Sequence, residues 1–183
     1  MKRIKFFFIS YFIIILFPIK SYGLIEVDIT RGNLNPLPLA VSPLSIDDKS
    51  KKSFEKILNK QNIGDEISLI VENNLRTSGL FNPLNKDAFL QAPDIANLKP
   101  RFEDWNLIKA QALITGKVNF DNEKLRVEFR LWDVLAGKEM MALAFTTVPN
   151  NWRRVGHIIT DKVYERLTGE KGYFDTRIIY VSE

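Results

Sequence analysis

Residues 112–132, with the sequence ALITGKVNFDNEKLRVEFRLW, decide the fold class. The second half alternates apolar and polar or amphipathic side chains, which is the period of a strand with one buried face; its apolar positions are Leu125, Val127, Phe129 and Leu131. Turn-forming residues 121–124 separate the halves, so the pattern predicts an antiparallel hairpin. A second turn near Ala136 and Gly137 leads to a third strand at 139–147.

Two amphipathic helices flank this meander. The first is predicted over 63–78, from an N-cap at Asn62 to a stop at Gly79; its apolar stripe is Ile63, Ile67, Ile70, Val71 and Leu75. The second runs from Asn150 or Asn151 to Gly169; its stripe is Trp152, Val155, Ile159, Val163 and Leu167. Together they predict an α+β domain of two layers, with two helices packed on a mixed, mostly antiparallel sheet of about five strands.

The remaining segments give weaker patterns. Residues 39–44 are a candidate first core strand, kept short by prolines on both sides. Residues 80–84 are predicted to be extended, 91–100 to be a loop, and the segment around Trp105 to form one or two helical turns. Residues 45–60 mix lysines with acids, which favours a solvated connector with a short helix near Phe54 over a basic contact patch.

The first 23 residues have the pattern of a cleaved secretory signal peptide. A basic start precedes a nearly unbroken apolar run at 6–17, and Ser21 and Gly23 place small residues at a cleavage site. An uncleaved anchor is the rival, but a spanning helix needs about 20 apolar residues. We therefore expect a mature chain that begins near Leu24 and works outside the cytoplasm, in the periplasm.

Composition narrows the function. A chain of 183 residues with 45% hydrophobic and 26% charged residues is expected to form one globular domain. The absence of cysteine excludes disulfides, thiolate metal sites, a cysteine nucleophile and a lipid-attached N-terminal Cys, and a single histidine excludes multi-histidine metal sites. The net charge of +4 comes from four cations in the predicted signal peptide, so the mature chain is formally neutral and nucleic-acid binding loses its main support.

No catalytic, cofactor or metal motif emerges from the spacing. His157 and Asp161 share a helix face, but no Gly-x-Ser-x-Gly nucleophile accompanies them, so a surface pair is favoured over a hydrolase. The Thr115-Gly116-Lys117 run lacks the earlier glycine of a phosphate loop, Gly169-Glu170-Lys171-Gly172 follows no strand, and Asp47-Asp48 lacks spaced calcium ligands. For the three tryptophans, packing is favoured over base stacking.

The two ends of the mature chain suggest a binding module. Residues 24–30 alternate in period two and are set apart by Gly32 and a proline-bearing segment; they are Leu24, Ile25, Glu26, Val27, Asp28, Ile29 and Thr30. This segment could add as a strand to a partner's sheet edge or pair with its own sheet, and the pattern leaves both open. Near the other end, 174–181 is predicted to be a further strand without a partner in this chain.

Several blocks of sequence resemble the N-terminal domain of the TolB family. They include Gly64-Asp65, residues 75–81, Trp105 with residues 110–116, residues 127–133, Trp152-Arg153-Arg154 with His157, and, most specifically, residues 161–178. The blocks occur in family order through most of the mature chain.

The resemblance implies a role for each part of the chain. It implies a periplasmic, non-enzymatic adaptor of the Tol-Pal system, which links TolA of the inner membrane to the outer-membrane lipoprotein Pal and serves envelope integrity, cell division and colicin import. By position, 24–35 would be the segment that contacts TolA, 36–172 the α/β domain, and 173–183 the start of a β-propeller. Because no propeller follows Glu183, Pal contact is not expected from this chain, and a gene fragment is expected.

Two alternatives stay open at this point. One is a periplasmic activator of envelope synthesis built on a similar small domain. The other is a hydrolase that uses His157 and Asp161.

Overall fold

The structure is a computed structural model, and it describes residue 25, residues 35–121 and residues 123–176. Its elements, in chain order, are β1 (Leu37–Val41), β2 (Ser45–Ile46), α2 (Asp48–Leu58), α3 (Ile63–Thr77), β3 (Phe81–Pro83), a short 3-10 turn η1 (Lys86–Ala88), α4 (Pro93–Leu98), α5 (Phe102–Leu107), β4 (Ala112–Asp121), β5 (Lys124–Asp133), β6 (Lys138–Thr147), a second 3-10 turn η2 (Pro149–Asn151) and α6 (Trp152–Thr168).

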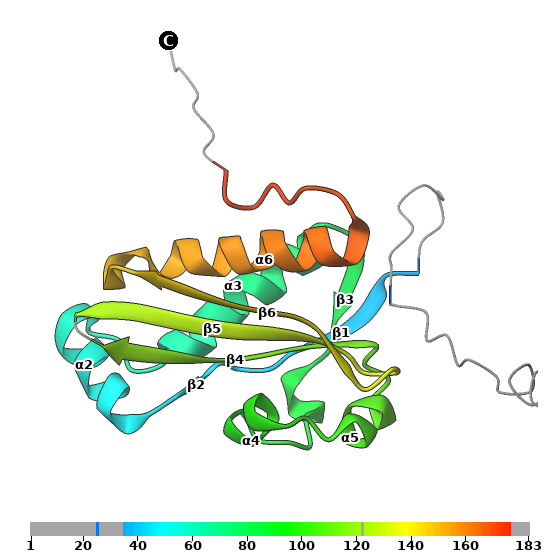
Figure 1. The fold of residues 1–183 in the computed structure, drawn as a ribbon, viewed down its shortest axis with the longest axis horizontal. Coiled ribbons are helices and arrows are strands. Elements are labelled where there is room, and N and C mark those ends of the chain that lie inside the picture. Colours follow the sequence, from blue (N-terminus) through cyan, green and yellow to red (C-terminus); the bar gives the residue numbers. More distant parts are fainter. Residues whose placement is uncertain (1–24, 26–34, 122, 177–183) are drawn as a thin grey trace, which may run out of the picture.

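The strands form one mixed sheet in the order β3-β1-β4-β5-β6, with β2 pairing separately with β4 (Figure 1). The predicted meander is confirmed, because β4, β5 and β6 pair antiparallel along nearly their whole length. The shorter strands β1, β2 and β3 pair parallel with their neighbours. The α+β class is therefore confirmed, and β2 brings the sheet from the predicted five strands to six.

Helices α3 and α6 pack together on one face of the sheet, as the two apolar stripes predict (Figure 1). Their stripe residues Ile67, Leu75 and Ile159 lie in the main core with the inward side chains of β5. Asn62 and Asn151 occupy the N-cap positions, but neither side chain makes a capping hydrogen bond. The predicted helix limits are thus right, although the capping chemistry expected of the two asparagines is not present.

The opposite face of the sheet carries α4 and α5 (Figure 1). A second, smaller core lies beneath them and centres on Trp105, which is 1% exposed. Gln91 ties this layer together, because its amide oxygen accepts hydrogen bonds from the indole of Trp105 and the backbone N–H of Arg101, both at 3.0 Å. The prediction that 91–100 is a loop was wrong at α4, where Pro93 stands in the first turn and needs no backbone N–H partner.

The stretch 45–60 also holds more structure than a solvated connector. Helix α2 runs for 11 residues, and its Phe54 is fully buried in the main core, edge-on to the ring of Phe120. The side chain of Asp47 caps the helix by accepting from the backbone N–H of Ser50 at 2.8 Å. One large buried residue and one capping side chain therefore hold α2 on the domain. Its many lysines made the sequence look like a solvated connector.

No helix within the described part of the chain combines the length and the apolar character that crossing a bilayer requires.

Candidate partner-binding site

Of the predicted binding residues, the structure describes Ile25, while Leu24, Glu26, Val27, Asp28, Ile29 and Thr30 lie outside the described residues. Ile25 is half-buried and packs against the main core. This contact puts one apolar residue of the alternating pattern on the domain. Whether the whole segment pairs with a strand stays a prediction.

The chain enters the domain at Leu37, whose backbone N–H donates to the carbonyl of Leu80 at 2.9 Å. From there β1 runs between β3 and β4. The predicted binding segment precedes β1 in sequence by a few residues that include Pro36, and β3, on the other side of β1 from β4, is an edge strand of the sheet. This edge is only three residues long and ends in Pro83, so it offers little backbone for pairing.

Strand β6 forms the other edge of the sheet and is much longer, with 10 residues. Residues 140–147 of this strand contain no charged residue, proline or glycine. Within the described residues, no strand pairs with its outer side. Near the start of this strand the guanidinium of Arg166 lies 3.5 Å from the carbonyl oxygen of Met140.

An open groove of about 290 Å³ lies beside this edge, between β6 and α6. Phe145, Val155 and Ile158 give it an apolar floor, and Thr147, Asn151 and Arg154 contribute polar groups. An unpaired strand edge next to an apolar groove can bind an extended peptide, because the edge supplies backbone hydrogen bonds and the groove receives alternate side chains. The uncharged run in β6 was visible in the sequence, but its position at an edge was not.

His157 and Asp161 do not form the pair that a catalytic role would need. His157 Nδ1 lies 2.8 Å from the amide nitrogen of Asn74 on α3, and that amide also donates to Thr160 Oγ1 at 3.1 Å. Asp161 instead accepts hydrogen bonds from the backbone N–H groups of Phe174 and Asp175. Both side chains are thus used in holding elements of the fold together, and the geometry gives the hydrolase alternative no support.

The described residues also bring together no metal site, since no three His, Cys, Asp or Glu side chains gather among them.

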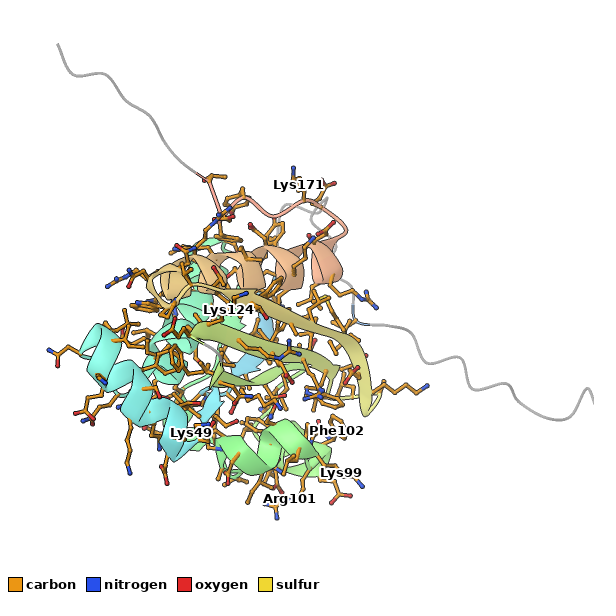
Figure 2. The ribbon with its side chains drawn as sticks, turned by 60° about the vertical axis from the view of Figure 1, so that its left-hand side comes forward. Lys49, Lys99, Arg101, Phe102, Lys124 and Lys171 are labelled. Carbon is orange, nitrogen blue, oxygen red and sulfur yellow. The ribbon has the colours of Figure 1, made fainter. Side chains whose placement is uncertain are left out.

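The cations labelled in Figure 2 come from several elements of the domain. Figure 2 shows Lys49 on α2, Lys99 and Arg101 near α4 and α5, Lys124 at the start of β5 and Lys171 beyond α6. These labelled side chains do not by themselves form the one-sided basic surface that nucleic-acid binding would need.

The sheet face beside α4 carries an ion-pair cluster around Glu128. The carboxylate of Glu128 lies 3.0 Å from the guanidinium of Arg126 and 3.4 Å from the ammonium of Lys117. Partial burial acts to raise the pKa of Glu128, but the hydrogen bond from Arg126 and the charge of Lys117 outweigh it and hold the pKa below its usual value. The cluster is solvated, so its contribution to stability is small.

The tryptophans have packing roles. Trp105 and Trp152 are buried, and the half-buried Trp132 donates its indole N–H to Thr115 Oγ1 at 2.9 Å. Their ring faces are covered by the fold or by neighbouring cations, as where Lys60 and Arg153 lie over Trp152. They form no stacking platform for bases.

Comparison with known proteins finds one family that matches most of this chain. The sequence profile of the TolB amino-terminal domain matches residues 25–140. The Tol-Pal system protein TolB of Pelagibacter ubique (strain HTCC1062) is 82% identical over 173 residues, which are 94% of this chain and 39% of that protein. This chain therefore spans well under half the length of that relative.

Two solved structures are similar in shape. TolB from Acinetobacter baumannii superposes with a TM-score of 0.60 at 20% identity, over 81% of this chain and 32% of that chain, which indicates the same fold. The LpoB C-terminal domain from Salmonella enterica gives a TM-score of 0.44 at 12% identity, over 70% of this chain and 88% of that chain, and supports no functional conclusion. Because the family profile covers more than half of its residues, the chain belongs to the TolB amino-terminal domain family.

Proposed function

We propose that this chain is a periplasmic, non-enzymatic adaptor domain of the Tol-Pal system. The observation that carries the proposal is the 82% identity, over 94% of this chain, to a protein named as a Tol-Pal system TolB. The signal-peptide pattern of residues 1–23 supports a periplasmic location. In this role the chain contributes to the link between TolA and Pal that serves envelope integrity, cell division and protein import.

The contact with TolA is assigned to residues 24–30. The alternation of Ile25, Val27 and Ile29 with polar residues suits a strand that buries one face against a partner. Ile25 already packs on the domain, so binding of the segment to a partner would compete with that contact. The contact with Pal is assigned to the propeller of the longer family members and not to residues 24–176.

Calorimetric titration of the C-terminal domain of TolA into residues 24–183 tests the assignment. A parallel titration uses a chain that starts at Pro36. A matched variant keeps the full mature chain and replaces Ile25, Val27 and Ile29 with serine, which preserves length and charge. We expect binding by the mature chain and none by the other two.

Equal binding by all three proteins would move the contact to the folded domain. Absence of binding by all three would contradict the adaptor role of this chain.

A further inference from the structure

The last described residues fold back along helix α6. The helix ends at Thr168, and Gly169 takes the left-handed conformation, with φ at 75°, that reverses the chain direction. Residues 170–176 then run along the outer side of α6, away from the sheet (Figure 1). We call residues 172–176 the exit strap.

Two acidic side chains anchor the exit strap: one lies on the helix and binds the strap, and the other lies on the strap and binds the helix. Asp161, on α6, accepts hydrogen bonds from the backbone N–H groups of Phe174 at 2.7 Å and Asp175 at 3.1 Å. Asp175, on the strap, accepts three hydrogen bonds of 3.0–3.1 Å from the guanidinium of Arg154. The hydrogen bonds to Asp175, together with its negative charge, raise the pKa of Arg154.

Hydrogen bonds fix where the strap lies along the helix. Phe174 and Asp175 meet Asp161 through their backbone N–H groups, and the chain bends at these two residues. From there the guanidinium of Arg154, seven positions before Asp161, reaches the carboxylate of Asp175. The strap is therefore held at two levels of α6.

Packing holds the strap at closest approach to the helix. A Cβ on Gly172 would lie 2.4 Å from the Cα of Asp161, so a side chain at this position would force the strap off the helix. Beside it, Tyr164 meets the rings of Tyr173 and Phe174 edge-on, with centroids 5.6 and 5.8 Å away. Tyr164 is 8% exposed, and burial, helped by the charges of Tyr173 and Glu170, raises the pKa of its phenol.

We propose that the exit strap is a rigid coupling that fixes the direction in which the chain leaves this domain at Thr176 and makes α6 and residues 172–176 move as one body. Hydrogen bonds, an ion pair, aromatic contacts and a steric fit act on only five residues, whereas an ordinary connector between domains is held by few contacts. The inference stands independently of the proposed function. Its consequence for longer family members is that a displacement of their C-terminal part is transmitted to α6.

A displacement of α6 would also be transmitted to α3. On its other side, Asn74 of α3 bonds to His157 and Thr160, and a Cβ on Gly156 would lie 2.8 Å from Ile70 of α3. The two helices are therefore in close contact, and they form the layer that covers one face of the sheet.

Hydrogen exchange followed by NMR on the full chain tests the coupling at the amides of Phe174 and Asp175. Gly172→Ala is the main variant, because it blocks the close approach and removes none of the anchoring groups. Asp161→Ala removes both acceptors, and Lys171→Ala is the matched control at an exposed position beside the strap. We expect both strap variants to lose the protection of these two amides by about tenfold or more, while the control keeps it and the core strands stay protected in all.

A distance measurement gives a second readout that a merely structural contact would not move. The chain has no cysteine, so spin labels at Thr176→Cys and Lys99→Cys report one distance only. We expect a narrow distance distribution that broadens when Gly172→Ala is added. Unprotected amides in the unsubstituted chain, or a distribution that is broad from the start, would overturn the proposal, as would a Gly172→Ala variant that folds and changes neither readout.

Discussion

Replacing Phe54 by alanine tests whether α2 is part of the core or an appendage. The Phe54 side chain is fully buried, and its ring lies 5.4 Å from that of Phe120. Truncating a buried phenylalanine costs about 3–5 kcal/mol. In a chain of this length each kcal/mol lowers the melting temperature by about 2–4 °C, so we expect a decrease of about 6–20 °C.

Ile57→Ala is the matched control, because it lies on the same helix and is 48% exposed. Both substitutions place alanine, the best helix former, in α2, so the difference between them reports packing rather than helix propensity. We expect the control to cost about 1 kcal/mol or less in urea unfolding followed by circular dichroism. If Phe54→Ala costs no more than Ile57→Ala, the docking of α2 described here is incorrect.

Three further substitutions test other parts of the fold. Gly64→Ala would place a Cβ 2.1 Å from the carbonyl oxygen of Leu44; overpacking of about 1–3 kcal/mol should outweigh the gain of about 1 kcal/mol in helix propensity, and an unchanged urea midpoint would contradict this. Asp47→Ala should cost about 1 kcal/mol at neutral pH. The hydrogen bond from the Ser50 backbone lowers the pKa of Asp47, so its stabilisation is present above the usual carboxyl pKa of 3.8 and is lost as the pH falls through the lowered value. The difference between the two proteins should therefore vanish in acid, and a difference that persists would show that the carboxylate is not its source. His157→Ala should keep full activity in an envelope-integrity assay, whereas lost activity at an unchanged melting temperature would restore the hydrolase hypothesis.

The long-period patterns of the sequence predicted the central fold. The alternation in β5 and the stripes of α3 and α6 each extend over at least ten residues, so one face of each element is specified many times over. Gly79 and Gly169 marked the ends of the two helices, and both have positive φ. Repetition of this kind survives an occasional misplaced residue, which explains why these elements were predicted nearly to their limits.

Helix α4 was missed, and α2 was predicted only as a short helix, because their apolar contacts are few and distant in sequence. Helix α4 has six residues and buries only Ala96 and Asn97, too few to create a period. Helix α2 buries Ser50 and Phe54, and six of its 11 residues are charged. In both, tertiary contacts made by one or two side chains stabilise the helix, and no local pattern encodes such contacts.

His157 and Asp161 also show that a local sequence pattern does not identify the partners of a side chain. Their spacing of four correctly placed both on α6, but helical spacing only makes a pair possible. Asn74, 83 positions away in sequence, takes the imidazole, and the backbone of the strap takes the carboxylate. Asn74 and the strap backbone therefore bind the two side chains in place of a contact between them, and only the folded chain brings these partners close.

The tail illustrates how a strand pattern can describe a segment that is not in a sheet. Residues 174–181 were predicted to be a strand; of these the structure describes 174–176, which lie along α6 without strand pairing and bend at Phe174 and Asp175, and the rest lie outside the described residues. The apolar residue Phe174 packs on Tyr164, and Asp161 accepts from the backbone N–H groups of Phe174 and Asp175. Consecutive N–H groups of a strand point to opposite sides, so two that converge on one carboxylate indicate a bend and not a strand. A partly apolar, β-rich sequence after a helix C-terminus is therefore compatible with a strap as well as with a sheet, and the residue that distinguishes them here is Asp161, about two turns before the helix ends.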